Sequence, residues 1–299
     1  MSVDNSPILV FGATGQQGGS VAAALMNAGW AVRAMVRDLR SPQSEALGNA
    51  GAELLEGNFD DVASMRTAMR GAYGVFSVQP SSPGGIITDE DEVRYGTVVA
   101  DLAVEAGAKH LVYTSGSAAG DQPTGVAHYD TKAQIERHIR SLPITSTIVR
   151  PATFMELLLM PGFGLDQGGF TFFMQPDKVM QVLAVEDIGK IVAAIFANPK
   201  EFSGQTFEIA SDVVTGTKLE ELFSELAGRH IPYSRFSNEV LEANPFLQKL
   251  IALVDDGRLA GNADLASLRE INPDQWSFKS WLEGPGRLAF EKALGTGGE

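Results

Sequence analysis

Short apolar runs alternate with longer amphipathic stretches through the first half of the chain. A short apolar run is typical of a strand buried on both faces, and the stretches between the runs have the hydrophobic spacing of helices. This alternation predicts an α/β fold built on a doubly wound parallel sheet, in which right-handed crossovers bring the loops after the strands to one edge. The expected strands are residues 8–11, 31–36, 52–55, 74–78, 110–114 and 144–149.

Capping signals place the helices between these strands. Asp60 and Asp61 precede a helix that runs to Met69, and their carboxylates suit the positive end of its dipole. Thr88, followed by four acidic residues, opens a second helix that runs to about Glu105.

The regular alternation stops after Pro151. A strongly amphipathic helix is expected at residues 185–197, and most of the later sequence is typical of helices. We therefore predict two domains. A nucleotide-binding domain covers residues 1–151, with a return helix and strand near residues 180–197. A smaller, mostly helical lobe at residues 152–299 binds substrate or a partner.

Two local features of the C-terminal part add further expectations. Asn272 and Pro273 are expected to cap and begin a helix ahead of Trp276, and residues 154–160 are helix-like. A set of large apolar residues could line a ligand pocket, with packing in a core as the alternative. This set is Phe154, Met155, Phe170, Phe172, Phe173 and Met174.

The first expected strand runs directly into a glycine-rich segment and then into a helix. Glycine allows the backbone to take positive φ and to approach a phosphate closely, and the amides at a helix start point toward an anion. A strand, this loop, a helix and a second strand are the pattern of a Rossmann dinucleotide site, and an ordinary turn is the alternative. The candidate pyrophosphate-binding residues are Gly12, Thr14, Gly15, Gln16, Gln17 and Gly18.

The end of the second strand selects the nucleotide. NAD sites place a carboxylate there for the ribose hydroxyl. In this chain Val36 is followed by Arg37, whose planar guanidinium suits a 2′-phosphate, and Arg40 is close by. Asp38 is the competing candidate, because a shift of one residue would favour NAD. We favour NADP(H) as the cofactor.

The ends of the third and fourth strands carry further candidates. Asn58 is placed to meet an adenine edge, although an asparagine here also suits a loop cap. The turn Gln79-Pro80-Ser81 lies on the ligand edge beside the nicotinamide, although proline alone can explain a turn.

Lys132 is the main catalytic candidate. It shares a helix face with His128, Ile135 and Ile139, and the isoleucines indicate that this face points inward. A lysine there can bond the nicotinamide ribose or act as an acid, and His128 could donate a proton near neutral pH. The alternative for Lys132 is an ion pair with Glu136 one turn on.

Composition narrows the ligand classes. The chain of 299 residues has 37 acidic and 23 basic residues and a net charge of −14, so we expect neither nucleic acid nor an anionic membrane as partner. It has no cysteine, and its four histidines lack a metal-ligand spacing, so no metal site is expected. Without a signal-peptide pattern or a membrane-length apolar run, we expect a soluble cytoplasmic protein, a monomer or homodimer.

These motifs carry a resemblance that runs over almost the whole chain. The chain resembles the short-chain dehydrogenase/reductase superfamily and, within it, the NmrA-like family of atypical NADP(H)-binding members. The segments that carry the resemblance are GATGQQGGSVA from Gly12, VRD at 36–38, GNFDD at 57–61, HYDTKAQIE at 128–136, RPATFMELLL at 150–159, residues 185–211 and NPDQWSFKSWL at 272–282.

The resemblance implies roles for individual positions. Gly12, Gly15 and Gly18 would bind the pyrophosphate, and Arg37 the 2′-phosphate. The other implied cofactor positions are Asn58 and Phe59 near adenine, Gln79, Pro80 and Ser81 along the nicotinamide, Lys132 on the ribose, and Phe154, Met155, Glu156 and Leu157 closing over the nicotinamide. The family's partner serine falls at Ser115 or Ser117.

One departure bears on the chemistry. Ordinary members of the superfamily use a Y-x-x-x-K pair, whereas the position four before Lys132 is His128, and Tyr129 is one residue out of register. A slip of one residue turns a helical side chain by ~100°, so Tyr129 cannot simply substitute. Cofactor binding is compatible with this departure, but the usual alcohol–ketone chemistry is not.

Two functions follow from this reasoning. The first, which we favour, is an NADPH-dependent reductase of an apolar quinone-, dye- or enone-like small molecule, with Lys132 or water supplying the proton. The second is a non-catalytic NADP(H) sensor, in which cofactor occupancy orders loop 79–85 and changes binding to a regulatory protein partner.

Overall fold

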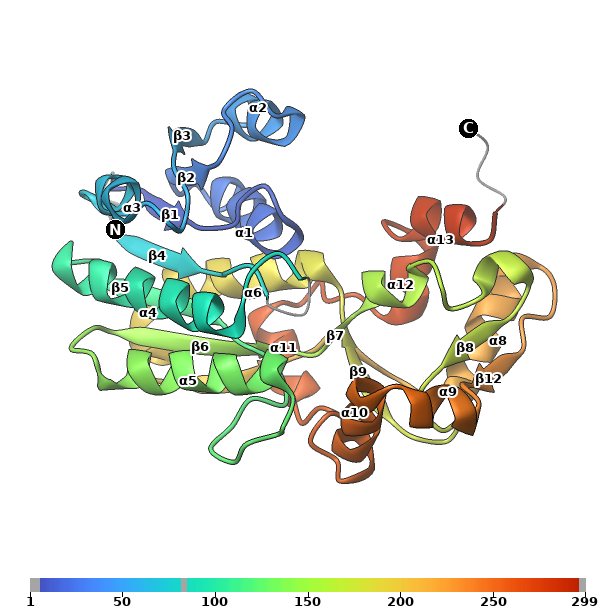
Figure 1. Cartoon of the computed structure of the whole chain (residues 1–299). Helices are drawn as coiled ribbons and strands as arrows, with labels where there is room; N and C mark the ends of the chain where they lie inside the picture. Colours follow the sequence, from blue (N-terminus) through green and yellow to red (C-terminus); the bar gives the residue numbers. More distant parts are fainter. Residues whose placement is uncertain (1–5, 82–84, 296–299) are drawn as a thin grey trace. The chain divides into compact units, whose positions relative to one another are not determined.

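The computed structural model describes residues 6–81 and 85–295, which form two compact units (Figure 1). Unit 1 consists of the residues up to Pro123, Ala127–Arg150 and Val185–Phe207. Unit 2 consists of Thr124–Val126, Pro151–Ala184 and the residues from Glu208 onward.

A parallel sheet forms the centre of unit 1. Its strands are β1 (Ile8–Val10), β2 (Val32–Val36), β3 (Glu53–Glu56), β4 (Gly74–Ser77), β5 (His110–Thr114), β6 (Ser146–Pro151) and β10 (Thr206–Ile209). They follow the order β10-β6-β5-β4-β1-β2-β3, and the pairs from β6 to β3 are parallel. The predicted doubly wound α/β fold is confirmed. The order reverses direction beside β1, the point at which such sheets bind ligands beyond the strand ends.

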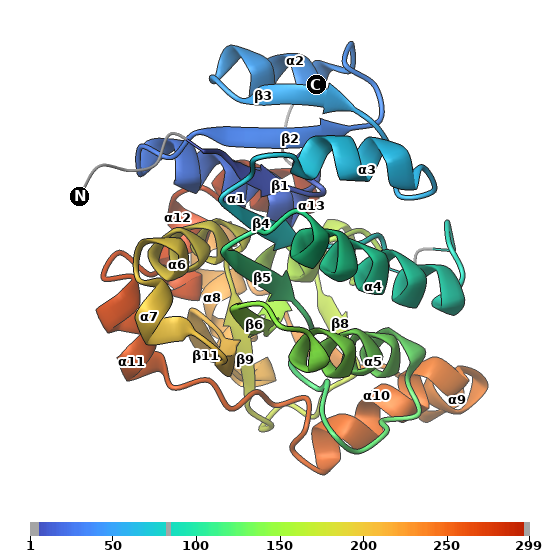
Figure 2. The ribbon, with the colours of Figure 1, turned by 90° about the vertical axis from the view of Figure 1, so that its left-hand side faces the viewer.

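Helices cover both faces of this sheet. They are α1 (Gln16–Asn27), α2 (Pro42–Asn49), α3 (Val62–Met69), α4 (Asp89–Glu105), α5 (Ala127–Ser141), α6 (Val185–Ala197) and α7 (Pro199–Phe202). In Figure 2, α1 and α6 lie on one face, and α3, α4 and α5 lie on the other.

The predicted capping residues begin two of these helices. Thr88 accepts the amide of Asp91, whose carboxylate accepts the amide of Thr88, so a reciprocal capping box opens α4. Asp61 accepts the amides of Ala63 and Ser64 at the start of α3. A cap of this kind contributes about 1 kcal/mol.

The core of unit 1 fixes the orientation of α5. Ile135 and Ile139 are fully buried and join Leu9, Phe11 and Tyr113 in one apolar cluster. The same helix face carries Lys132 inward, as its spacing predicts.

Unit 2 contains small sheets and short helices. Its strands are β7 (Thr153–Phe154), β9 (Met180–Leu183) and β11 (Asp212–Val214) in one sheet, and β8 (Phe170–Phe172) and β12 (Tyr233–Arg235) in another. Its helical segments are η2 (Met155–Leu159), η3 (Leu165–Gln167), α8 (Gly216–Ala227), α9 (Asn238–Ala243), α10 (Pro245–Asp255), α11 (Leu265–Ile271), α12 (Phe278–Glu283) and α13 (Arg287–Ala293).

Of two local predictions for unit 2, the first is wrong and the second is confirmed over most of its length. Asn272 ends α11 as its C-cap, and α12 begins later, where Ser277 and Ser280 form a capping box. The side chain of Ser277 therefore does what Asn272 was expected to do. The helix-like segment expected at residues 154–160 is the 3-10 helix η2 over Met155–Leu159, and only Phe154 belongs to the strand β7.

Most of the residues expected to line a pocket are packed in the core of unit 2. The rings of Phe170 and Phe172 stack with centroids 5.9 Å apart, and the ring of Phe170 lies 5.0 Å from that of Phe223. The buried members of the set are Met155, Phe170, Phe172 and Met174, and the half-buried ones are Phe154 and Phe173. The core-packing alternative therefore applies to the four buried residues.

Candidate functional site

The glycine-rich turn after β1 has the geometry that its sequence predicts. Gly12 has a φ of +64°, and its carbonyl accepts the amide of Gly15. A Cβ on Gly18 would overlap the backbone carbonyls of Gly12 and Phe11. Only glycine at position 18 therefore lets α1 begin this close to the turn.

The start of α1 is open to an anion. Its N-cap residue, Gly15, supplies no side-chain cap, and Thr14, Gly15 and Gln16 are exposed. The first amides of a helix have no partner within the helix and carry partial positive charge. Gln17 has another role, because its Oε1 accepts the Thr114 hydroxyl at 2.8 Å and ties the turn to the end of β5.

The end of β2 presents two exposed cations. Within the described residues, the guanidinium groups of Arg37 and Arg40 make no hydrogen bond or ion pair. The competing residue, Asp38, accepts the backbone amide of Arg40 through Oδ1 at 2.8 Å. Exposed guanidinium groups beside a turn whose free amides suit an anion fit a 2′-phosphate. The turn and these cations together fit a phosphorylated dinucleotide.

The residues after β3 are held by their own loop. Asn58 Oδ1 accepts hydrogen bonds from the amides of Asp60 and Asp61. The side-chain oxygen of Asn58 therefore caps its own loop, as the alternative interpretation expected. Phe59 stacks between Phe11 and Tyr95, with ring centroids 5.5 and 5.2 Å away. The adenine contact predicted for Asn58 and Phe59 stays a prediction.

The turn after β4 reaches toward α5. Gln79 Nε2 donates to the Ser77 hydroxyl at 2.7 Å, and Pro80 is exposed. Ser81 Oγ lies 2.8 Å from Nδ1 of His128. Of the segment 79–85 that was expected to become ordered, residues 82–84 lie outside the described residues.

Lys132 is buried against a carboxylate that sequence reasoning missed. Its Nζ donates to Glu92 Oε1 at 2.5 Å and to Ser81 Oγ at 3.3 Å, and it lies 3.5 Å from His128 Nδ1. Lys132 is 8% exposed and Glu92 is 1% exposed. The alternative pairing with Glu136 is wrong, because Glu136 binds arginines instead.

A periodic signal for Glu92 was present in the sequence. Glu92 lies on the buried face of α4, in step with Tyr95, Gly96, Val99 and Ala103. Glu92 is the last of four consecutive acidic residues at the start of α4. Acidic residues are common in the first turn of a helix, so its burial was not recognised.

Burial changes the acidity of the groups around Lys132. Desolvation lowers the pKa of Lys132, and the Glu92 carboxylate offsets part of this change. Burial, together with the charge of Lys132, lowers the pKa of His128 to about 3. His128 is therefore neutral near pH 7, and its predicted role as a proton donor stays a prediction. Burial raises the pKa of Tyr129 to about 12.

A second buried carboxylate supports the end of β6. Burial would raise the pKa of Glu136, but hydrogen bonds from Arg150, contact with Ser115 and the charge of Arg140 hold it below its usual value. Arg150 donates through Nε and Nη2, at 2.9 and 2.7 Å. Ser115 is buried at the end of β5 beside this pair.

The segment predicted to close over the nicotinamide belongs to unit 2. Phe154 ends β7, and the other three residues begin η2. Phe154 and Glu156 are half-buried, Met155 is buried and Leu157 is exposed. Their predicted contact with a cofactor stays a prediction.

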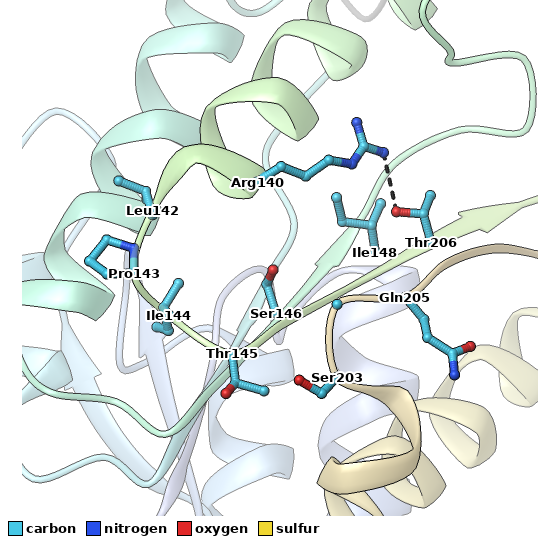
Figure 3. Close-up of a pocket in the computed structure, with 11 residues that line it drawn as sticks. Arg140, Leu142, Pro143, Ile144, Thr145, Ser146, Ile148, Ser203, Gln205 and Thr206 are labelled. Atoms are coloured by element: carbon cyan, nitrogen blue, oxygen red, sulfur yellow. Dashed lines mark hydrogen bonds between the residues drawn. The ribbon is translucent and has the colours of Figure 1, made fainter.

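The pocket in Figure 3 belongs to a different part of unit 1. It has a volume of about 630 Å³ and lies where β6 and β10 begin, whereas the candidate residues lie after strand ends. Arg140 Nη2 donates to Thr206 Oγ1 at 3.1 Å across it. This pocket is not the candidate site.

The described residues hold neither a membrane-spanning helix nor a metal-ligand cluster. None of their helices is both long and apolar enough to cross a membrane. They contain no cluster of three or more histidine, aspartate and glutamate residues able to hold a metal ion.

The fold and the turn define a dinucleotide-binding α/β protein, and comparison with known proteins identifies its family. The model of the NmrA-like family matches residues 4–264, and the chain belongs to this family. The NmrA-like oxidoreductase LnaB of Aspergillus flavus is 33% identical over 76% of this chain and 75% of its own. The NmrA-like oxidoreductase MalD of Malbranchea aurantiaca is 30% identical over 78% of this chain and 76% of the MalD chain.

Solved structures share the fold at lower identity. The negative transcriptional regulator NmrA in complex with NADP has a TM-score of 0.77 and 21% identity over 97% of this chain and 98% of its own. The triphenylmethane reductase of Citrobacter sp. with NADP(H) has a TM-score of 0.75 and 21% identity. The match covers 96% of this chain and 100% of the reductase. An NADPH-dependent quinone oxidoreductase of Escherichia coli has a TM-score of 0.74 and 22% identity. The match covers 92% of this chain and 98% of the oxidoreductase. The predicted family is confirmed, and the cofactor predicted from sequence is of the class that these neighbours hold or use.

Proposed function

We propose that the protein is an NADPH-dependent reductase of a quinone-, dye- or enone-like acceptor. One observation carries the proposal: a phosphate-type turn and a buried lysine meet the end of the same strand. Thr114, the last residue of β5, bonds Gln17 of the turn. Gly116, two residues after Thr114, lies against Lys132. A Cβ built at position 116 would be 3.5 Å from the Lys132 side chain. The turn and Lys132 therefore lie along one sheet edge, and this supports a shared site for phosphate binding and proton transfer.

The cofactor would be held by residues of unit 1. The turn at Gly12–Gly18 and the first amides of α1 would bind the pyrophosphate, and Arg37 with Arg40 would bind the 2′-phosphate. Lys132 would bond the nicotinamide ribose. Bound NADPH would supply a hydride to the acceptor.

The protein's own part in the chemistry is to provide a proton without a tyrosine. An acid is most effective when its pKa lies near the working pH, and burial moves Lys132 in that direction. His128 is neutral and can pass a proton on but cannot store one. Quinones, dyes and enones suit this arrangement because hydride transfer to them needs less proton delivery in the transition state.

The relatives support a reductase at the level of class. Both LnaB and MalD are named oxidoreductases, and two structural neighbours are named for dye and quinone reduction. The structural neighbours are under 25% identical to this chain. The proposed class of acceptor is therefore argued from the residues of this chain and is to be tested by experiment.

Turnover with a panel of acceptors tests the proposal. NADPH oxidation is followed with quinones, triphenylmethane dyes and enones, and we expect turnover with at least one class. Lys132→Ala should lower kcat by roughly 100-fold, the usual contribution of a general acid. Lys109→Ala, which removes an exposed lysine, is the matched control.

The opposite result would favour a sensor. Tight NADPH binding without turnover on any acceptor, combined with a protein partner that binds only in one cofactor state, would overturn the reductase and support regulation.

A further inference from the structure

Glu92, Lys132, Ser81 and His128 form one hydrogen-bonded chain. The steps are 2.5 Å from Glu92 Oε1 to Lys132 Nζ, 3.3 Å from Nζ to Ser81 Oγ and 2.8 Å from Oγ to His128 Nδ1. The four side chains come from three places: α4, the turn after β4, and α5. Folding therefore assembles this chain from unit 1 residues alone.

Chemistry fixes the direction of the hydrogens in this chain. An ammonium group can only donate, so Ser81 Oγ accepts from Lys132 and has its own hydrogen to give. His128 Nδ1 faces two donors, the Ser81 hydroxyl at 2.8 Å and Lys132 Nζ at 3.5 Å. Nδ1 is therefore an acceptor, and in the neutral imidazole the hydrogen lies on Nε2.

We propose that this chain is a proton relay in which Ser81 bridges Lys132 to His128 and Glu92 keeps Lys132 charged and in place. The proposal rests on the proposed reductase activity. The acceptor, negatively charged after gaining hydride, takes the Nε2 proton of His128. Nδ1 takes the Ser81 hydroxyl proton, and the Ser81 oxygen takes a proton from Lys132. Lys132 ends neutral. Water then protonates His128 Nε2, and the Nδ1 proton returns through Ser81 to Lys132, which restores the starting state.

Glu92 is a positioning residue in this scheme. A buried ammonium without a counter-ion would lose its proton or leave the site, because desolvation of a single charge is expensive. The Glu92 carboxylate offsets that effect at 2.5 Å. It also sets which rotamer of Lys132 is populated, and this keeps Nζ within reach of Ser81.

Three other titratable groups lie near the relay: Tyr113, Tyr129 and Glu136. From β5, Tyr113 is fully buried, and its pKa is raised well above normal by burial and by the charges of Glu92 and Glu136. Tyr129 on α5 is the ring neighbour of His128, with centroids 4.9 Å apart. Glu136, one turn beyond Lys132, is neutralised by Arg140 and Arg150. Because a raised pKa keeps Tyr113 neutral, Lys132 is the group whose protonation near the working pH responds to Glu92.

Nitrogen NMR of the cofactor-free protein tests the hydrogen positions directly. With ¹⁵N-histidine labelling, His128 should be neutral with its hydrogen on Nε2 from pH 5 to 8, as the geometry of the relay requires. Ser81→Ala should shift the Nδ1 resonance, whereas Ser81→Thr should preserve it. A hydrogen on Nδ1 in the native protein would overturn the relay.

Kinetics tests the role of Glu92. Glu92→Gln should lower kcat by roughly 10-fold or more and move the alkaline limb of its pH profile to lower pH, because Lys132 then loses its proton more easily. KM should change less, and Glu92→Asp should restore part of the rate. Glu90→Gln removes an exposed carboxylate from the same helix and is the control. Equal pH profiles for the Glu92→Gln and Glu90→Gln variants would overturn the positioning role.

The two tests separate this inference from the proposed function. NMR needs neither cofactor nor turnover, so a wrong tautomer in a protein that still reduces quinones would overturn only the relay. The expected tautomer in a protein that turns over no acceptor would overturn the reductase, and the relay with it.

Discussion

The glycine turn and the Lys132 group lie along one sheet edge, yet their polar groups are satisfied in opposite ways. At the turn, α1 starts without a side-chain cap, and Arg37 and Arg40 make no ion pair within the described residues. Lys132, in contrast, is held by side chains of the protein itself, those of Glu92, Ser81 and His128. The turn is open for a ligand, whereas the lysine group is preorganised.

This difference predicts which property each region controls. New hydrogen bonds form at the turn only when a ligand binds, so changes there should act on affinity. At Lys132 the hydrogen bonds already exist in the free protein, so changes there should act on proton chemistry and on the pH dependence of folding.

The first of two equally large effects is expected from Gly18→Ala. The added Cβ would overlap backbone atoms of Gly12 and Phe11, which cannot move as a flexible side chain can. Overpacking of this kind costs about 1–3 kcal/mol, and the turn must shift to relieve it. Because the shifted turn no longer fits the pyrophosphate, NADPH affinity measured by calorimetry should fall by a comparable amount, roughly 10- to 100-fold. Gly48→Ala is the control, since its Cβ would meet only the Leu54 side chain. Unchanged affinity in the Gly18→Ala variant would show that the turn does not bind the pyrophosphate.

The next effect concerns the choice between nucleotides. Arg37→Ala removes a guanidinium that a 2′-phosphate would bind, and a charge-assisted hydrogen bond contributes about 1.5–3 kcal/mol. NADPH affinity should therefore fall roughly 10- to 100-fold, while NADH affinity stays nearly constant. Arg137→Ala, an exposed arginine on α5, provides the control for net charge. An equal loss for NADPH and NADH would mean that Arg37 does not read the 2′-phosphate.

The open region could be predicted from sequence because its signals are local. Gly12, Gly15 and Gly18 lie within one turn, and Arg37 follows one strand. Apolar runs predicted each strand of the sheet from β1 to β6 to within two residues. Capping chemistry at Asp61 and Thr88 was readable for the same reason, since each side chain meets amides two or three residues away.

The preorganised region could be predicted only in part because its contacts are long-range. Helical spacing placed Lys132 inward, but its partner Glu92 is forty residues away in sequence. The nearer carboxylate, Glu136, suggested a pair that the arginines at 140 and 150 prevent. In unit 2, strands such as β7 and β11 are too short for a periodic signal, and Asn272 was misread because a cap residue suits either end of a helix.

The smallest effect is the acid sensitivity of the buried histidines. Burial lowers the pKa of His128 to about 3 and that of His110 to about 4, from 6.5 in the unfolded chain. The unfolded state binds more protons below pH 6.5, so the folded state loses stability as the pH falls from there toward these values. Each histidine should remove about 1 kcal/mol between pH 7.5 and 5.5.

Urea unfolding at both pH values measures this loss. His128→Asn and His110→Asn should each reduce the drop by about 1 kcal/mol, even though each also lowers stability at pH 7.5. His110 serves as the comparison because it lies in the core, where its Nε2 meets Thr147 Oγ1 at 2.8 Å, away from the relay. A drop unchanged by His128→Asn but reduced by His110→Asn would mean that the Lys132 group is open to water in solution and not preorganised.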